Sequence, residues 1–201
     1  MRGYTDARAE VQDPASAFIK NYLAVCLYYA GDIETSNWKF DEALNLAPYQ
    51  RLILRYAIVL AAQEKDTARV RQLIQLASDD KNALPDYARP LLQLLEGDRH
   101  SLRDLVESWH SNLEDTYVYS HNFTQMYYFL GDYKNHFHWF AVQEDEYTTL
   151  HLTNMFLVGI PNYWENLEAW VDKDPDQQAE RRTLLDDHRA RIARVTEKMV
   201  L

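Results

Sequence analysis

The sequence predicts an all-α fold built from stacked helix hairpins, and three observations lead to this prediction. A two-residue motif ending in aspartate recurs at Gly31-Asp32, Lys65-Asp66, Gly97-Asp98 and Gly131-Asp132, with spacings of 34, 32 and 34 residues. A period of this length is typical of helical hairpin repeats. Apolar residues at helical spacing flank the motifs. The chain also has only 5 Gly and 6 Pro in 201 residues, too few for an all-β protein with many tight turns.

Composition limits the broad class of the protein. With 201 residues and 47% hydrophobic content, the chain can form one compact domain or one short solenoid. No run of about 18 apolar residues occurs, so we expect no transmembrane helix. The N-terminus lacks the apolar segment of a secretory signal. The single cysteine, Cys26, excludes an internal disulfide framework and fits a reducing compartment. We therefore expect a cytoplasmic protein.

Residues 1–16 are predicted to be the remnant of a preceding repeat. Tyr4, Ala7 and Val11 follow a helical spacing that ends at Asp13-Pro14. A stable solenoid would not normally begin on the second helix of a hairpin. We therefore expect the chain to be a fragment, or the C-terminal part of a longer protein.

The first of four hairpins predicted over residues 17–150 surrounds Gly31. The segment AFIKNYLAVCLYYA precedes this turn, and TSNWKFDEALNLA follows it and ends at Pro48. Apolar residues of the second segment lie near helical spacing: Trp38, Phe40, Ala43, Leu44 and Ala47.

The next three hairpins repeat this organisation. The segments after the second and third turns each have one apolar face at i, i+3, i+4 and i+7. These faces consist of Val70, Leu73, Ile74 and Ala77, and of Leu102, Leu105, Val106 and Trp109. Pro90 lies within the first helix of the third hairpin, so we expect that helix to start late or to kink. The fourth hairpin joins YVYSHNFTQMYYFL to YKNHFHWFAV.

The chemistry of the motif explains its position between helices. Glycine just after a helix can adopt the left-handed conformation that closes a C-cap. Aspartate can then accept hydrogen bonds from the free N–H groups of the next helix. Lys65 replaces glycine in the second motif, so we expect that turn to be less tight or differently supported.

The repeat pattern weakens after Glu146. Residues 151–175 are predicted to be a degenerate fifth hairpin, because Gly159 and Pro161 interrupt its first helix and its second is short. Residues 176–201 are predicted to be a C-terminal capping helix with a narrow apolar stripe: Leu185, His188, Ile192, Val195 and Met199. The stripe can cover the last hairpin, or it can pair with a second copy in a dimer; its short length favours the cap.

Residues in corresponding slots of the hairpins carry a family resemblance. The slots are Leu23, Ala24, Leu27, Gly31, Phe40, Ala43 and Pro48 in the first unit, Ala57, Ile58, Ala61, Val70, Ile74 and Ala77 in the second, and Phe123, Thr124, Tyr127, Gly131, His136 and Phe140 in the fourth. This pattern resembles tetratricopeptide repeats, which implies a right-handed superhelical solenoid that binds proteins or peptides. The tail is similar to the C-terminal ends of bacterial signalling chains, where such repeats follow a DNA-binding or nucleotide cyclase domain.

The same resemblance implies a binding face. In tetratricopeptide repeats the first helix of each hairpin lines the concave surface. By slot, the inward residues here are Asn21, Tyr28, Arg55, Tyr87, His121, Gln125 and Tyr128. Tyrosines suit peptide recognition because each offers a large ring and a polar tip. Each tyrosine can instead serve interhelix packing.

Charge is concentrated in the second half of the chain. Twelve acidic residues but only two basic ones, Lys134 and Lys173, lie between Asp104 and Asp174, and the whole chain carries a net charge of −10. Such a field repels nucleic acid phosphates and attracts a cationic partner. The alternative is that the acids only keep the surface soluble.

Candidate chemical residues do not form a catalytic or metal-binding pattern. His136 and His138 project from nearly opposite sides of a helix, so we expect no metal site and instead a charge change of these histidines, with His110 and His121, between about pH 5 and 8. Cys26 lies in an apolar run and is expected to be buried and inert. The acids 144–146 are expected to form a solvated helix end. No phosphate-binding loop, serine elbow or zinc spacing occurs.

The sequence therefore predicts a protein- or peptide-binding scaffold, part of a larger bacterial signalling or regulatory protein, and not an enzyme. We expect no cofactor, no membrane contact and no nucleic acid contact by this segment. The alternative function is self-association, with the C-terminal stripe forming a homodimer.

Overall fold

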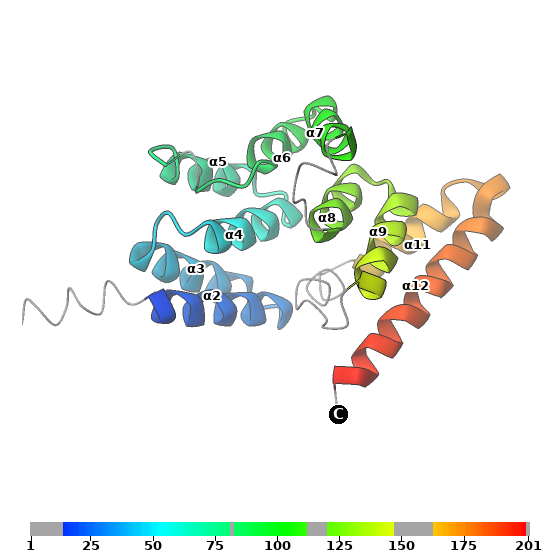
Figure 1. Ribbon diagram of the computed structural model, residues 1–201, viewed down its shortest axis with the longest axis horizontal. Helices are drawn as coiled ribbons and strands as arrows, with labels where there is room; N and C mark the ends of the chain where they lie inside the picture. Colours follow the sequence, from blue (N-terminus) through cyan, green and yellow to red (C-terminus); the bar gives the residue numbers. More distant parts are fainter. Residues whose placement is uncertain (1–13, 81–82, 112–119, 147–162, 200–201) are drawn as a thin grey trace, which may run out of the picture. The chain divides into compact units, whose positions relative to one another are not determined.

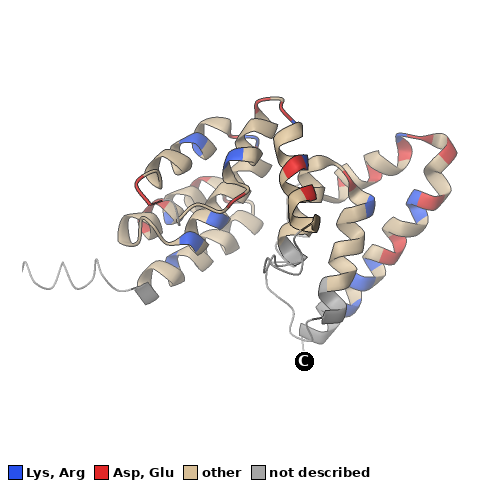
Figure 2. Cartoon of the chain, turned by 45° about the horizontal axis from the view of Figure 1, so that its top comes forward, with Lys and Arg blue, Asp and Glu red and all other residues tan. Residues whose placement is uncertain are grey.

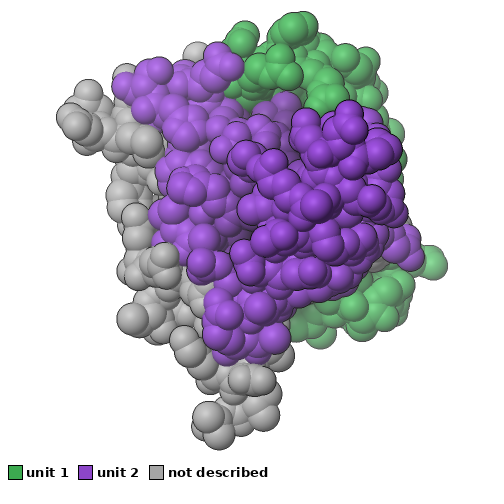
Figure 3. All heavy atoms as spheres, turned by 90° about the vertical axis from the view of Figure 1, so that its right-hand side faces the viewer, with its two compact units in different colours: residues 1–105 green, residues 106–201 purple. Residues whose placement is uncertain are grey.

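The described part of the chain is helical. The computed structural model describes residues 14–80, 83–111, 120–146 and 163–199, and these ranges contain ten α-helices, one 3₁₀ turn and no strand (Figure 1). This confirms the all-α prediction. None of the described helices combines the length and the apolar character that crossing a membrane requires. The chain divides into two compact units, residues 1–105 and 106–201, which Figure 3 distinguishes by colour.

Unit 1 contains helices that pack in sequential pairs. Its elements are α2 (Pro14–Tyr29), α3 (Ile33–Leu46), α4 (Arg51–Gln63), α5 (Thr67–Leu76), α6 (Ala88–Leu95) and the first half of α7 (His100–Ser111). Helix α2 packs on α3, and α4 packs on α5 while also contacting α2, α3 and α6. Helix α4 is apolar on nearly all sides, as expected of a central buried helix, and Ile53, Leu54 and Ile58 are fully buried.

Four of the described helices end in the same backbone turn. Gly31, Lys65, Gly97 and Gly131 have φ values of 84°, 56°, 105° and 68°. In the first turn, the Asp32 amide donates to the Leu27 carbonyl and the Gly31 amide donates to the Tyr28 carbonyl, both at 3.0 Å. The other three turns repeat this pair of bonds, which is the Schellman arrangement that closes a helix C-terminus.

The expectation for Lys65 is wrong. The Lys65 amide donates to the Ala62 carbonyl at 3.0 Å and the Asp66 amide donates to the Ala61 carbonyl at 2.9 Å, as in the glycine turns. The turn is therefore equally tight, and lysine adopts a left-handed conformation that is unfavourable for a residue with a Cβ atom.

Each aspartate of the motif accepts hydrogen bonds from the helix that follows, as predicted. Asp32 Oδ1 accepts from the Thr35 amide at 3.1 Å, and Asp66 Oδ1 accepts from the Arg69 amide at 2.9 Å. Likewise, Asp98 accepts from the His100 amide and Asp132 accepts from the Asn135 amide. These bonds satisfy amide groups that the first turn of a helix leaves without a partner.

The starts of two helices can be compared with those predicted from the sequence. Helix α6 begins at Ala88, so Pro90 lies in its first turn, where proline is tolerated. The prediction of a late start is confirmed. Helix α2 begins at Pro14 rather than residue 17, and the rest of the expected remnant lies outside the described residues.

Unit 2 contains two further helix pairs. Its elements, after the end of α7, are α8 (Ser120–Leu130), α9 (Tyr133–Glu146), α11 (Tyr163–Asp172), the 3₁₀ turn η1 (Pro175–Gln177) and α12 (Gln178–Met199). Helix α8 packs on α9, and α12 packs on both α11 and α9. Leu185, His188 and Ile192 of the predicted stripe are buried. The first helix of the predicted fifth hairpin lies outside the described residues.

Candidate protein-binding surface

Helix α2 exposes apolar side chains that none of the described helices covers. Ile19, Tyr22 and Leu23 are 68%, 41% and 44% exposed, and Cys26 is also exposed. The four residues follow the i, i+3, i+4 and i+7 spacing of one helix face. We call them the outer apolar face.

The opposite side of α2 is mostly apolar as well, with buried Asn21 as the exception, so the helix has little polar surface to turn outward. Ala17, Ala24, Val25 and Tyr28 point into unit 1 and are buried. The only charged residue within the helix is Lys20, whose Nζ lies 2.9 Å from Glu42 Oε2 at the flank against α3. A helix that is apolar all round is normally covered on all sides.

Cys26 corrects a prediction from the sequence. Its apolar neighbours suggested a buried thiol, but the structure places it on the outer apolar face, exposed to solvent. An apolar run identifies the interior only when the other side of the helix is polar, and here it is not.

Acidic residues gather at the C-terminal end of α2. Asp32 and Glu34 follow this end, and the Tyr28 hydroxyl donates to Glu64 Oε1 at 2.5 Å, which places the second turn beside the first. Asp66 and Lys65 belong to that second turn. We call Asp32, Glu34, Glu64 and Asp66 the acidic turns; none of them forms an ion pair within the described ranges. Figure 2 shows acidic residues in red at several interhelical turns.

The concave-face residues predicted in unit 1 lie mostly in the interior. Asn21, Tyr28 and Tyr87 are buried, while Arg55 is half-buried. Both amide atoms of Asn21 lack a hydrogen-bond partner among the residues described. These side chains have little free surface for a ligand, so their binding role stays a prediction.

Tyrosines link the first helices of the hairpins within unit 1. Burial raises the pKa of Tyr56 to about 12, with Arg55, Tyr22 and Tyr87 in electrostatic range. Burial also raises the pKa of the Tyr87 hydroxyl, although the Arg55 charge opposes the shift. The hydroxyls of Tyr56 and Tyr87 are therefore neutral at physiological pH. Tyr22, which is close enough to affect the pKa of Tyr56, belongs to the outer apolar face.

The concave-face residues predicted in unit 2 are also interior where they can be described. Gln125 and Tyr128 are buried, and Asn166 Nδ2 donates to the Tyr128 hydroxyl at 3.0 Å. The side chain of His121 lies outside the described residues. The binding role of these three residues likewise stays a prediction.

A chain of hydrogen bonds joins two buried histidines through one tyrosine in unit 2. His136 Nδ1 lies 2.8 Å from the Thr124 carbonyl, and His136 Nε2 lies 2.7 Å from the Tyr163 hydroxyl. The same hydroxyl lies 2.6 Å from His188 Nε2. The three side chains come from α9, α11 and α12, so the network ties these helices together.

Hydrogen-bond chemistry assigns the protons of this network. A carbonyl only accepts, so His136 Nδ1 must carry a proton and neutral His136 Nε2 must accept from Tyr163. The Tyr163 oxygen then accepts from His188 Nε2–H. His188 Nδ1 remains a buried acceptor without a partner in the part of unit 2 that the structure describes.

Burial keeps both histidines neutral. It lowers the pKa of His136 to about 4, with the Thr124 carbonyl opposing the shift. Burial also lowers the pKa of His188, and the nearby His136 lowers it further. The expected change of charge between about pH 5 and 8 is therefore wrong for His136. His188, which the sequence placed only in an apolar stripe, belongs to the same network.

Of the other histidines, His100, His110 and His138 lie at exposed positions. His138 is exposed, two residues from buried His136, as their helical spacing predicts. His110 is exposed, and its Nε2 lies 2.6 Å from the Tyr127 hydroxyl. No group of three or more metal-ligating side chains comes together within the described ranges.

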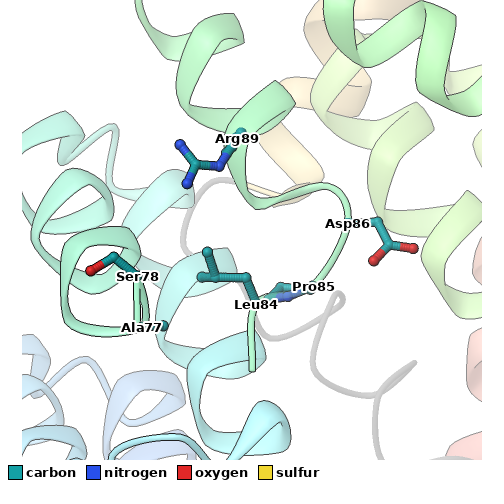
Figure 4. Close-up of a pocket in the computed structure, with 6 residues that line it drawn as sticks. All are labelled: Ala77, Ser78, Leu84, Pro85, Asp86 and Arg89. Carbon is teal, nitrogen blue, oxygen red and sulfur yellow. The ribbon is translucent and has the colours of Figure 1, made fainter. Parts of the chain in front are cut away.

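A recess in unit 1 lies between the end of α5 and the start of α6. Its volume is about 330 Å³, and its lining consists of Ala77, Ser78, Leu84, Pro85, Asp86 and Arg89 (Figure 4). Asp86 points away from the other five residues in this view, and its Oδ1 lies 3.2 Å from Arg51 Nη2. The lining does not bring an acid and a base together as a general acid–base site requires.

The outer apolar face could have been predicted from the spacing of its residues. Ile19, Tyr22, Leu23 and Cys26 are spaced as one stripe, while Ala17, Ala24 and Tyr28 form a second stripe on the same helix. Two apolar stripes on one segment indicate either a central helix or a helix with an interaction surface.

Comparison of the chain with models of known protein families, with curated proteins and with solved structures finds no match.

Proposed function

We propose that this protein is a scaffold of tetratricopeptide-like hairpins that binds a protein or peptide, in a cytoplasmic regulatory role. The recurrence of one turn at spacings of 34, 32 and 34 residues supports the repeat class. The pairwise packing of consecutive helices in each unit is compatible with it. The net charge of −10 supports a cationic partner over a nucleic acid.

The outer apolar face of α2 is the single observation that carries this proposal. Isolated exposed apolar residues are common, whereas contiguous ones that lie on one face mark interaction surfaces. Ile19 and Leu23 lie on adjacent turns of one helix face, and both side chains are exposed. Covering them with a partner would remove apolar area from water, worth about 25 cal/mol per Å².

Self-association through the C-terminal stripe is the second candidate, and it has less support. Leu185, His188 and Ile192 are already buried within unit 2. A dimer through this stripe would require α12 to leave α9 and α11, which would also break the hydrogen bond between Tyr163 and His188.

Selection from a displayed peptide library tests the binding proposal. We expect the intact chain to enrich peptides that lose binding to a Leu23→Asp variant. The aspartate carboxylate is strongly hydrated, and its water would have to be removed before a peptide could pack on this face.

Leu76→Asp is the matched control, because Leu76 on α5 is 43% exposed against 44% for Leu23. Selected peptides should bind this variant as they bind the unchanged chain, and circular dichroism should show both variants folded. The proposal fails if no peptide is enriched, or if the two substitutions weaken binding equally.

A further inference from the structure

A histidine stands at the centre of the face by which α12 packs on α9 and α11 (Figure 1). Within residues 178–194 of this helix, the buried side chains are Leu185, His188 and Ile192. The centroid of the His188 ring lies 4.5 Å from that of Phe137 and 4.6 Å from that of Phe140. The middle contact of α12 therefore comes from a side chain that can acquire a charge, with an aliphatic side chain on either side of it.

The groups around the His188 imidazole offer no carboxylate among the described residues. Besides the two phenylalanines, it meets His136 from α9, and Tyr163 and Trp164 from α11. The charge that acts on it from α12 itself is that of Arg191, which is also positive. Its Nδ1 atom is buried without a partner in the part of unit 2 that the structure describes. A proton on Nδ1 would therefore place an unpaired positive charge in a buried site, which is costly.

Ion pairs at the surface also hold α12, and they do not titrate together with His188. Glu168 of α11 lies 2.6 Å from Arg182 and 2.5 Å from Arg189. Hydrogen bonds from Arg182 and Arg189 lower the pKa of Glu168 below its ordinary 4.5, so this carboxylate stays charged in mild acid. The other pairs between α12 and its neighbours are Lys134 with Glu180, Arg182 with Asp172, and Arg181 with Asp174 at η1.

We infer that α12 is a proton-released cap, which leaves α9 and α11 when His188 takes up a proton. The released helix brings the imidazole into water, where its charge is solvated, and breaks its hydrogen bond with Tyr163. Phe137 and Phe140 are buried in the closed form, so release uncovers an apolar face of α9. This device does not depend on the binding proposal for α2.

Helix α9 keeps its other partner when α12 leaves. Phe123 of α8 stacks on Trp139 of α9, with ring centroids 4.2 Å apart. His136 Nδ1 donates to the Thr124 carbonyl of α8, and this bond does not need α12. The opening is therefore a local step within unit 2, as expected where one element has fewer contacts than the rest.

Native-state hydrogen exchange of the whole chain, corrected for the intrinsic effect of pH, tests the release. Burial lowers the pKa of His188 from its ordinary 6.5, so opening takes up a proton below pH 6.5 and the open form gains as the pH falls. The opening constant of α12 should rise roughly tenfold for each pH unit between pH 6 and 4.5. At each pH the opening constant of α8 should stay at least about tenfold lower, because α8 opens only when unit 2 unfolds.

His188→Gln removes the titrating group and keeps an amide that can donate to Tyr163. The opening of α12 should then lose its pH dependence over this range. His188→Leu, which fills the site without a polar atom, should give the same flat response, so the result does not depend on how well glutamine is accommodated.

His110→Gln is the matched control for the imidazole. His110 Nε2 lies 2.6 Å from the Tyr127 hydroxyl, as His188 Nε2 does from that of Tyr163, but His110 is exposed and belongs to α7. This variant should keep the tenfold dependence. Glu168→Gln is the control for the ion pairs, and it should raise the opening constant of α12 at every pH without changing the slope.

Three outcomes overturn the inference. Equal opening constants for α8 and α12 would show that unit 2 unfolds as one body and releases no cap. A pH dependence that persists in both His188→Gln and His188→Leu would assign the proton to another group. A flat response in Glu168→Gln would assign the release to the ion pairs.

Discussion

At the scale of single residues, Lys65 is the position where local conformation and residue type disagree. Its φ of 56° lies in the left-handed region, which costs an L-residue roughly 1–2 kcal/mol. The two hydrogen bonds of the turn and the cap by Asp66 hold it there. The turn therefore forms even though lysine does not favour its backbone conformation.

We expect Lys65→Gly to stabilise the chain by a few tenths to about 1 kcal/mol. Glycine relieves the left-handed strain, although it also gives the unfolded chain more conformational freedom. The gain should appear as a higher urea midpoint with an unchanged slope.

Adding a side chain at one of the glycine turns supplies the control for Lys65→Gly. Gly97 has a φ of 105°, and a Cβ atom there would meet no atom within 4 Å, so Gly97→Ala tests backbone strain without a clash. It should destabilise by about 1 kcal/mol. A loss of stability in Lys65→Gly would mean that the lysine side chain contributes more than its conformation costs.

At the scale of elements, the hydroxyl of Tyr163 holds α9, α11 and α12 together. It donates to His136 on α9 and accepts from His188 on α12. All three side chains are buried, and a buried polar group left without a partner costs about 1–3 kcal/mol. One oxygen atom is therefore the hydrogen-bond partner of both Nε2 atoms.

We expect Tyr163→Phe to destabilise unit 2 by roughly 2–4 kcal/mol, because both histidines lose their Nε2 partner while the ring is preserved. Urea unfolding measures the total loss. Native-state hydrogen exchange should show that α12 opens more readily than α4.

Tyr133→Phe is the control for the hydroxyl. Tyr133 packs edge-on against Trp170, with ring centroids 5.7 Å apart, and its hydroxyl has no hydrogen bond among the described residues. This change should leave stability within about 0.5 kcal/mol. Equal losses in the two variants would mean that the network contributes nothing specific.

The sequence predicts individual helices well wherever one side of the helix is polar. Val70, Leu73 and Ile74 follow the spacing of one face of α5 and are all buried. In α3 the same reasoning succeeds for Phe40 but not for Trp38, which is 56% exposed. Apolar spacing identifies a face but cannot say which side of a fully apolar helix meets the core.

The candidate site was the least predictable part, for the same reason. Cys26 was expected inside and lies outside, and Asn21 and Tyr87 were assigned to a binding face but lie in the interior. The hydrogen bonds of Tyr163 could not be predicted either, because they join residues from three helices that lie far apart in sequence. Such proximity depends on packing, which spacing along one helix does not encode.

At the scale of the whole molecule, the two units differ in their buried histidines. His136 and His188 lie in unit 2 and are buried without charge. Unit 1 contains only His100, which is exposed. Any cost of protonating a buried imidazole therefore falls on unit 2.

We expect acid to destabilise unit 2 before unit 1. Between pH 6.5 and the folded pKa of about 4, His136 binds a proton only when unfolded, so stability falls as the pH is lowered through this window. The loss amounts to roughly 3 kcal/mol from His136 alone. Hydrogen exchange, corrected for the intrinsic effect of pH, should show α11 and α12 losing protection first.

His138→Gln provides the control for this acid response. His138 lies two residues from His136 on α9 and is exposed, so replacing its imidazole should leave the acid transition unchanged. Simultaneous loss of protection in both units, or a transition that moves with His138→Gln, would contradict the assignment to the buried pair.

The turn at Lys65 bears on how hairpins of this kind can be recognised. Its backbone is the same as that of the glycine turns, although lysine stands where the other three turns have glycine. The pair of hydrogen bonds that closes the helix is therefore common to all four turns, and the residue type is not. A search for such hairpins would find more of them by comparing the hydrogen bonds of their turns than by requiring glycine.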